Sequence, residues 1–247
     1  MKILVIPDTQ IKPGVPTEHL LWAGRACVEY KPDVIVHLGD HWDFVSLNSY
    51  LPPLEIESTR LLADIDSGNQ ALELFQQPIK DYNKGRRKKY KPQLHLLRGN
   101  HEQRLQRYIS DHPALEALIG FHLLKSDGWT VHPFLEVVEI AGIHFSHYFY
   151  SPNTGRPLCG TAHSKLKNVG LSFVMGHQQG KDLAERSLPN GQKQRALIVG
   201  SFYLHNESYR GPQGYESWRG VVVLNDAKNG SYDLMELGID YLKRKFA

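Results

Sequence analysis

The sequence predicts an α/β protein with parallel strands in its N-terminal half, and three observations indicate this class. Short apolar runs rich in β-branched residues alternate there with longer amphipathic stretches of helical periodicity. The order strand, helix, strand between Lys2 and Leu38 forms a βαβ unit, which joins parallel strands through a right-handed crossover. Polar residues directly follow the strands, at the edge where open α/β sheets bind ligands. From Val131 onward the pattern becomes richer in strands, which adds an α+β character.

Composition and length are those of an ordinary globular protein. With 247 residues, 41% hydrophobic and 22% charged, the chain fits one domain, 1–247, with a helical and basic insertion at about 55–92. The net charge of +3 does not by itself indicate a polyanionic partner. No apolar run is long enough for a transmembrane helix and the start is too short for a signal peptide, so we expect no membrane partner. Cys27 and Cys159 cannot form a disulfide framework; we expect both to be partly buried, and a cytoplasmic location is the simplest.

Helices and strands are predicted to alternate in the N-terminal half. The expected strands are 2–6, 34–38 and 93–97. The expected helices are 17–30, about 58–82, a short one ending near 109 and another starting at 113. Thr17 is the expected N-cap of the first helix, and Pro113 suits a first helical position. Apolar residues at intervals of three, four and seven support the long helix.

The C-terminal part is predicted to consist mainly of strands and hairpins. The expected strands are 136–140, 143–147, 171–175, 196–199, 220–224 and 232–237. A helix is expected at about 160–169, closed by Gly170. Turns are expected at 141–142, 189–191 and 229–230, each of which contains a glycine.

The stretch 34–43, V-I-V-H-L-G-D-H-W-D, is the first indication of a functional site. A buried strand ends at Gly39, and Asp40 and Asp43 follow it. A single strand that ends in Gly-Asp is more often an ordinary turn, but similar polar groups recur at five strand ends. They are Asp8 and Gln10; Asp40 and Asp43; Asn100 and His101; His147; and His177 and Gln179. A mixed Asp, Asn and His set suits manganese, iron, zinc or nickel better than calcium or magnesium.

The order D-x-[HQ], G-D-x-x-D, G-N-H-E, H and G-H-x-[HQ] between Asp8 and Gln179 resembles the calcineurin-type metallophosphoesterase superfamily. The chain especially resembles the small phosphoesterases of this superfamily in bacteriophages and bacteria. The resemblance implies a four-layer fold, a β-sandwich of two mixed sheets flanked by helices. It also implies hydrolysis of phosphate esters at a dinuclear metal centre through a metal-bound hydroxide.

The resemblance further implies a role for each motif residue. The residues expected to bind the first metal are Asp8, Gln10, Gln179 and the bridging Asp40. Those expected to bind the second metal are Asp40, Asn100, His147 and His177. His101 would contact the leaving-group or phosphoryl oxygen and act as general acid, and Asp43 would hold it oriented and charged.

Two glutamines depart from the commonest pattern of the superfamily. Gln10 and Gln179 stand where most members carry histidine, and both serve the first metal. An amide oxygen is a weaker and harder donor than imidazole, so we expect a weak first site that prefers Mn²⁺ over Zn²⁺. Manganese is therefore favoured for the two divalent ions, with iron, zinc, nickel and magnesium as alternatives. In a second interpretation the glutamines only hydrogen-bond a water, and His41 supplies the missing ligand.

Phe44 marks a second departure. Phosphoprotein phosphatases of the superfamily have an arginine at this position, immediately after G-D-x-x-D. Loss of this cation favours a phosphodiester over a dianionic monoester, although Arg98 and Arg104 flank the G-N-H-E motif and are able to compensate. These two arginines, His41 and Tyr148 are the candidate substrate-binding residues.

Segment 84–91, K-G-R-R-K-K-Y-K, carries six positive charges. Two interpretations remain open: a solvated loop after a helix C-terminus, which is the commoner case, or a contact to a phosphate backbone. Aromatic residues in the segments 147–150, 202–205 and 209–218 either stack on bases or pack at the edge of the sandwich.

We therefore expect a phosphodiesterase that acts on nucleotides or nucleic acid as its substrate and partner. The alternatives are a phosphomonoesterase, including a Ser/Thr protein phosphatase, and a catalytically weak member that binds nucleic acid. The two glutamines keep the last alternative open, and the sequence does not indicate an oligomeric state.

Overall fold

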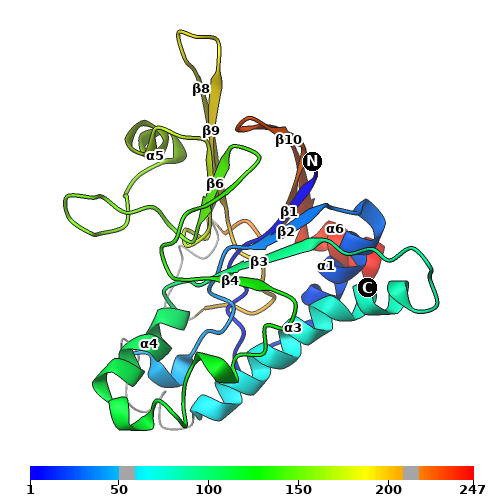
Figure 1. The fold of residues 1–247 in the computed structure, drawn as a ribbon, viewed down its shortest axis with the longest axis vertical. Helices are drawn as coiled ribbons and strands as arrows, with labels where there is room; N and C mark the ends of the chain where they lie inside the picture. The colour runs from blue at the N-terminus through cyan, green and yellow to red at the C-terminus, as the bar shows by residue number, and fades with distance from the viewer. Residues whose placement is uncertain (50–58, 208–216) are drawn as a thin grey trace.

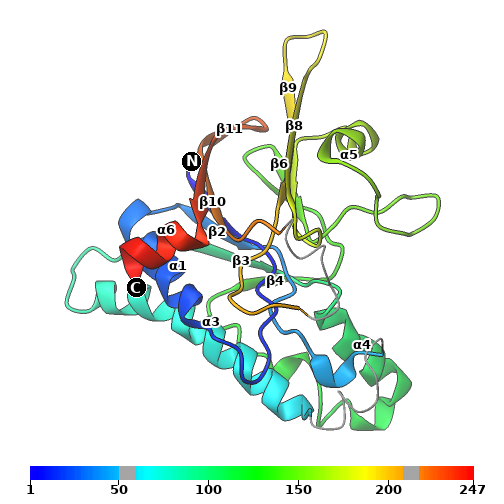
Figure 2. The same ribbon diagram turned by 180° about the vertical axis from the view of Figure 1, so that it is seen from behind.

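The computed structural model describes residues 1–49, 59–207 and 217–247. Two mixed β-sheets pack face to face, and helices cover their outer sides (Figure 1). The view from behind shows α5 on one outer side and α1, α3 and α6 on the other (Figure 2). This arrangement confirms the expected four-layer sandwich.

The first sheet has the strand order β11-β10-β1-β2-β3-β4. Its strands are β1 (Ile3–Ile6), β2 (Val34–His37), β3 (Gln93–Leu97), β4 (Thr130–His132), β10 (Gly220–Lys228) and β11 (Ser231–Gly238). Strands β1 to β4 are parallel, as the βαβ pattern predicts, whereas β10 is antiparallel to β1 and β11 is antiparallel to β10. The parallel strands therefore all end at the same edge of the sheet.

The second sheet has the strand order β5-β6-β7-β9-β8. Its strands are β5 (Val138–Ile140), β6 (Ile143–Ser146), β7 (Phe173–Met175), β8 (Lys181–Ser187) and β9 (Lys193–Val199). The three central strands are parallel to one another, and the edge strands β5 and β8 run antiparallel to their neighbours. The ends of β6, β7 and β9 therefore also share one edge.

The helices form the outer layers. They are α1 (Glu18–Tyr30), α3 (Leu61–Asn83), α4 (Glu102–Asp111), α5 (Ala162–Val169) and α6 (Ile239–Phe246). Helices α1 and α3 approach so closely that a Cβ at Gly24 would lie 2.2 Å from the carbonyl oxygen of Phe75. A glycine is needed at this crossing because any side chain would push the two helices apart.

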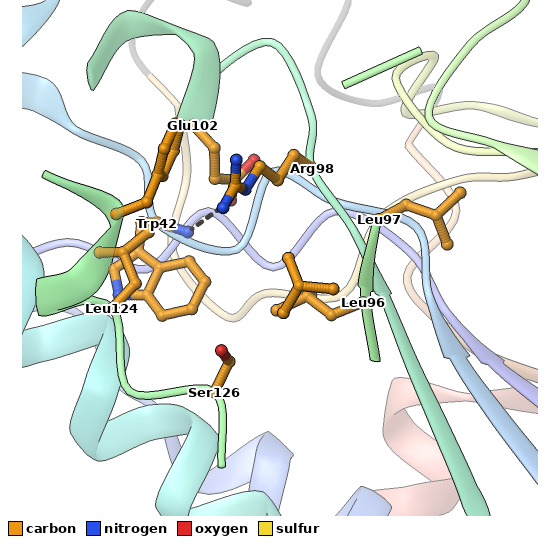
Figure 3. A pocket seen from close by; sticks show the side chains of 9 residues that line it. Trp42, Leu96, Leu97, Arg98, Glu102, Leu124 and Ser126 are labelled. Carbon is orange, nitrogen blue, oxygen red and sulfur yellow. Dashed lines mark hydrogen bonds between the residues drawn. The ribbon is translucent and has the colours of Figure 1, made fainter. Parts of the chain in front are cut away.

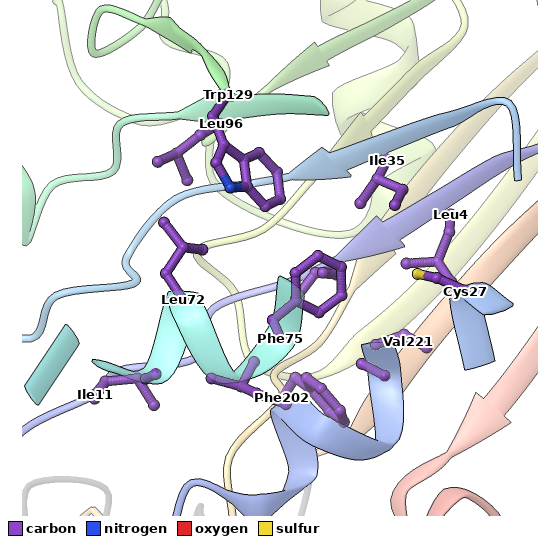
Figure 4. Packing of buried hydrophobic residues seen from close by; sticks show 14 of the residues in the cluster. Leu4, Ile11, Cys27, Ile35, Leu72, Phe75, Leu96, Trp129, Phe202 and Val221 are labelled. Atoms are coloured by element: carbon purple, nitrogen blue, oxygen red, sulfur yellow. The ribbon is translucent and has the colours of Figure 1, made fainter. Parts of the chain in front are cut away.

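The central strands β1 and β2 of the first sheet bury both of their faces. In β1, Ile3 and Val5 face the apolar interior between the sheets, whereas Leu4 and Ile6 face the core under the helices. Figure 4 shows this second core, in which Phe75 of α3 lies close to the sheet. Removal of this apolar surface from water is the main force that holds the four layers together.

Several element ends differ from the sequence-based predictions. The long helix begins at Leu61, and the expected start at residue 58 lies outside the described residues. Thr17 holds the N-cap position, but its side chain makes no capping hydrogen bond. Pro113 opens only a 3₁₀ turn, Pro113–Leu115, because the backbone N–H of Glu116 bonds three residues back to Pro113. The expectation that Cys159 is partly buried is wrong, because this thiol is exposed, whereas Cys27 is buried.

Helix α6 was not expected from the sequence. Its buried residues, Leu242 and Phe246, lie one turn apart and complete the core beside α1. None of the helices in the described residues combines the length and the apolar character that crossing a bilayer requires.

Candidate metal centre

Loops from both sheets converge where the parallel strands end. Asp40 follows β2, His147 follows β6 and His177 follows β7, and these three side chains each place a ligand atom within 4.8 Å of the others. Asn100, which follows β3, joins them, because its Oδ1 lies 2.8 Å from His147 Nε2 and 2.8 Å from His177 Nδ1. The four residues that were expected to bind the second metal therefore lie together.

Hydrogen bonds orient these ligand atoms. His147 Nδ1 lies 2.9 Å from the carbonyl oxygen of Leu38 and donates to it, which leaves Nε2 free to bind a metal. The same Nε2 lies 3.3 Å from Asp40 Oδ2. Such a backbone partner fixes both the ring orientation and the tautomer of a metal-binding histidine.

Asp8 lies next to this group and has an unsatisfied oxygen. Its Oδ1 accepts the backbone N–H of His177 at 3.0 Å, whereas its Oδ2 is buried without a hydrogen-bond partner in the described part of the chain. Burial raises the pKa of Asp8 to about 7, against the effect of His147, which lowers it. A buried carboxylate oxygen without a partner is costly unless a cation binds it, so this residue fits the first metal.

Charge is balanced inside the site between carboxylates and imidazoles. Burial alone would raise the pKa of Asp40, but His101 and His147 hold it well below its ordinary value. Burial alone would lower the pKa of His147, but Asp40 raises it to about 9. The donor set of carboxylate, amide and imidazole groups fits divalent transition metals.

The backbone around Asp40 has an uncommon conformation. Gly39 has φ +99° and Asp40 itself has φ 50°, so the chain turns sharply as it leaves β2. A Cβ at Gly99 would lie 2.1 Å from Asp40 Oδ1. The second and third motifs, G-D-x-x-D and G-N-H-E, therefore need glycine, because the loops after β2 and β3 pack closely against each other and against the Asp40 carboxylate.

Glu102 joins these two loops, a role that sequence reasoning missed. Its fully buried carboxylate accepts four backbone N–H groups, from Gly99 at 2.7 Å, Asp40 at 3.0 Å, His41 at 2.6 Å and Trp42 at 3.0 Å. Figure 3 shows this side chain above Trp42 at the wall of a small cavity. Glu102 thus fixes the position of Asp40 relative to the G-N-H-E loop.

His101 and Asp43 form a close pair, as expected. His101 Nδ1 lies 2.6 Å from Asp43 Oδ1, and His101 Nε2 lies 3.6 Å from Asp40 Oδ2. Burial alone would lower the pKa of His101, but Asp40 and Asp43 raise it above its ordinary value. The imidazole is therefore held by Asp43 at Nδ1, with its Nε2 directed towards Asp40 in the metal centre.

Two cations support Asp43, and only one of them was expected near the site. Arg104 Nη1 donates to the Asp43 carbonyl oxygen at 2.8 Å, and Lys12 Nζ lies 3.4 Å from Asp43 Oδ2. Lys12 also donates to Glu207 at 2.8 Å, and Glu207 in turn lies 2.5 Å from His205 Nε2. Lys12 and Glu207 are 195 residues apart in the chain, so no local pattern could have identified this pair.

The two glutamines of the first and last motifs are both buried. Gln10 has φ 43°, and its backbone N–H donates to the carbonyl oxygen of Asp40 at 2.8 Å. Gln179 Oε1 accepts the hydroxyl of Tyr203 at 2.5 Å. A metal bound to Gln179 Oε1 would share this oxygen with a phenol, which lowers its donor strength further.

His41 does not fit the roles considered for it from the sequence. It is fully buried, its Nδ1 lies 2.8 Å from Thr9 Oγ1, and its Nε2 donates to the carbonyl oxygen of Gly68 at 2.9 Å. Both ring nitrogens are therefore used within the protein, and neither faces a metal or a substrate. The strand-end position of His41 misled the prediction, because an i+1 neighbour of Asp40 points to the opposite side of the turn.

The other substrate-binding candidates differ in position. Arg104 Nη2 lies 3.2 Å from His101 Nε2, inside the site. The guanidinium of Arg98 instead stacks 3.5 Å from the centre of the Phe121 ring, at the small cavity of Figure 3. The Tyr148 ring lies 4.8 Å from the His177 ring and is mostly buried, whereas the neighbouring Tyr150 is exposed.

The remaining aromatic candidates are largely part of the core. Phe202 is fully buried under the helices, and Tyr203 is buried against His205. Of the segment 209–218, positions 209–216 lie outside the described residues. In the described part, the packing interpretation therefore fits 202–203 better than base stacking.

A family comparison agrees with this geometry. Residues 1–241 match the family described as Calcineurin-like phosphoesterase, so the chain belongs to this family. Among curated proteins, a sequence comparison finds no match. Family membership and the clustered ligand atoms of Asp40, His147 and His177 identify a metal-binding hydrolase of phosphate esters.

Proposed function

We propose that the protein hydrolyses phosphodiester bonds in nucleotides or nucleic acid. The observation that carries this proposal is Phe44, the residue after G-D-x-x-D. Its side chain is fully buried in the core under the helices, and its backbone has φ 50°. The position that would hold a cation against a dianionic monoester therefore holds a hydrocarbon ring directed away from solvent.

Divalent metal ions, with Mn²⁺ favoured, would polarise the phosphoryl oxygens and activate a water for in-line attack. Asp40 and Asp8 would hold one ion, with Gln10 and Gln179 as weak donors, and Asp40, Asn100, His147 and His177 would hold the other. The protein itself supplies the proton for the leaving oxygen, from Nε2 of His101. Asp43 keeps that imidazole oriented through the 2.6 Å bond to Nδ1.

A phosphomonoesterase is the second candidate, and Arg104 favours it. Its guanidinium lies 3.2 Å from His101 Nε2, close enough to contact a phosphate that His101 protonates. Against this, Arg104 already donates to the Asp43 carbonyl oxygen and lies 3.5 Å from the Asp43 carboxylate. Much of its charge is therefore used within the protein.

The test compares initial rates on bis(4-nitrophenyl) phosphate and 4-nitrophenyl phosphate with added Mn²⁺. We expect a higher kcat/KM for the diester, and loss of that activity in Asp40→Asn, which removes a charged ligand from the metal centre. A preference for the monoester that Arg104→Gln abolishes would replace the first proposal with the second. Absence of turnover on both esters, with metal bound, would favour a member that only binds nucleic acid.

A further inference from the structure

The basic loop 84–91 lies at the end of the first sheet opposite the metal centre. It joins the end of α3 to the start of β3, whereas Asn100 follows the other end of β3. At about 3.3 Å per residue, the extended stretch from Lys91 to Asn100 spans up to about 30 Å. A ligand that fills only the metal centre therefore does not reach this loop.

Positive charge is concentrated in this loop. The segment contributes +6 to a net charge of +3, so the remainder of the chain carries −3. Of its six cations, only Lys84 forms an ion pair in the described residues, with Asp81. Arg86, Arg87 and Lys88 are exposed, and no carboxylate in the part of the chain that the structure describes forms an ion pair with them.

The loop is held in a defined conformation. The Asn83 side chain closes its base, because Nδ2 donates to the Tyr90 carbonyl oxygen and Oδ1 accepts the Tyr90 N–H, both at 2.8 Å. Tyr90 is anchored in turn, since its hydroxyl donates to the carbonyl oxygen of Pro32 at 2.9 Å. Fixed cations lose less conformational freedom on binding than cations on a loose tail.

Aromatic rings connect the loop to a second group of cations. Lys31 Nζ lies 3.1 Å from the centre of the Tyr82 ring, and the Arg86 guanidinium lies 4.0 Å from the same ring. Next to Lys31, the Tyr30 hydroxyl lies 2.8 Å from that of Tyr241 in α6. Helix α6 and the loop project at the same end of the molecule in both ribbon views (Figure 1, Figure 2).

We define the basic end surface as residues 84–91 and the cations of α6, Lys243, Arg244 and Lys245, of which Lys245 forms an ion pair with Glu29. All three α6 cations are exposed, whereas Leu242 and Phe246 of the same helix are buried. A helix that inserts into a membrane surface presents an exposed apolar face beside its cations, whereas Leu242 and Phe246 of α6 point inward. A phosphate backbone needs only the cations.

We propose that the basic end surface binds the phosphate backbone of a nucleic acid strand, away from the metal centre. A strand that occupies both places must be long, so the surface selects polynucleotides over small esters. The catalytic consequence rests on the proposed phosphodiesterase function, whereas the binding itself does not.

Binding is tested by fluorescence anisotropy with a labelled single-stranded DNA of about 30 nucleotides, in chelator, over about 50 to 200 mM salt. The variant replaces Arg86, Arg87, Lys88 and Lys89 with glutamine. The matched control replaces four exposed lysines elsewhere: Lys125, Lys167, Lys193 and Lys228. We expect the loop variant to reduce the slope of log K against log salt by about 2 to 3 units, because each lost phosphate contact removes about 0.7.

Rate measurements distinguish a failure of this inference from a failure of the proposed function. With Mn²⁺, the loop variant should keep its rate on bis(4-nitrophenyl) phosphate and lose about tenfold or more in kcat/KM on the oligonucleotide. Failure of wild type on the aryl diester would count against the proposed function alone, since the binding slopes need no turnover. Equal salt slopes for loop variant and control would overturn the inference. So would binding of wild type to anionic phosphatidylserine vesicles but not to the oligonucleotide.

Discussion

His101 occupies the position from which a proton can reach a leaving oxygen in the metal centre. Its Nδ1 is bound to Asp43 at 2.6 Å, so the opposite nitrogen, Nε2, faces the carboxylate of Asp40. Arg104 and Lys12 hold Asp43 from two sides. The imidazole is thus restrained by groups from two loops and from helix α4.

Removal of the Asp43 charge should shift the pH dependence of hydrolysis. Asp40 and Asp43 raise the pKa of His101 against the effect of burial, so this acid stays protonated to a higher pH than a free imidazole. In Asp43→Asn the pKa falls, so the alkaline limb of the kcat profile should move to lower pH. We expect a loss of about 100-fold at pH 8 for a poor leaving group, and a small loss for 4-nitrophenolate. An unchanged profile would show that Asp43 does not act through His101.

Metal titration should reveal two unequal sites. Gln179 Oε1 is shared with the Tyr203 hydroxyl, whereas Asn100, His147 and His177 are arranged around one point. Calorimetric titration of the apoprotein with Mn²⁺ should therefore show a tight and a weak step. Gln179→His should strengthen the weak step about tenfold, and more for Zn²⁺, because imidazole is the softer donor. The control, Asn100→Ala, should lose the tight step; two equal tight steps in wild type would contradict this assignment.

At the scale of the elements, Glu102 holds the loops after β2 and β3 together. Glutamine has one acceptor oxygen, and its NH₂ group would face backbone N–H donors that the carboxylate now satisfies. Glu102→Gln should therefore lower the free energy of unfolding by about 3 kcal/mol. Urea denaturation in chelator measures this change, with the exposed Glu116→Gln as the matched control. Equal effects of the two substitutions would remove the proposed role of Glu102.

Elements that depend on apolar periodicity could be predicted from the sequence. Strands β1 and β2 lie where their β-branched runs indicate, because strands buried on both faces consist mainly of such residues, and β3 lies where its leucine-rich run indicates. Helix α6 was missed because its apolar residues only gain a partner once α1 is in place. Its three consecutive cations at the chain end resemble a solvated tail.

The residues of the metal centre likewise include some that could be predicted from the sequence and some that could not. Asp8, Asp40, Asn100, His147 and His177 could be predicted because each follows a strand end, and parallel strands bring their ends together. Lys12, Glu207 and Tyr203 could not, because their contacts are made between loops far apart in the chain. His41 shows the limit of positional reasoning, since its two ring nitrogens contact Thr9 and the Gly68 carbonyl oxygen of α3.

At the scale of the whole molecule, the metal centre joins the two sheets. Asn100 follows the first sheet, whereas His147 and His177 follow strands of the second. Metal binding should therefore stabilise the sandwich as a whole, by about 2.7 kcal/mol at 100 times Kd. Thermal unfolding with and without Mn²⁺ measures this effect, and His147→Ala should abolish most of it. A metal-independent Tm in wild type would indicate that the ligands do not hold an ion together.

Acid should weaken the fold through histidines that are buried in neutral form. His19 is fully buried, with its ring 4.8 Å from that of Phe202, and burial lowers its pKa to about 3. Burial likewise lowers the pKa of His41 to about 4. In the unfolded chain each takes up a proton near pH 6.5, so between pH 6.5 and the folded pKa the unfolded state binds more protons. The contribution of these two histidines to stability is therefore complete above pH 6.5 and is lost as the pH drops towards their folded pKa values.

The pH dependence that His19 contributes to stability can be measured with a single substitution. Each such histidine contributes a loss of about 1.4 kcal/mol in the free energy of unfolding per pH unit over its window. In His19→Leu, urea denaturation between pH 6.5 and 4 should show a slope smaller by this amount, because the leucine binds no proton in either state. The exposed His163→Leu serves as the control and should follow wild type. Parallel curves for His19→Leu and wild type would mean that the protein opens locally and lets His19 titrate before the sandwich unfolds.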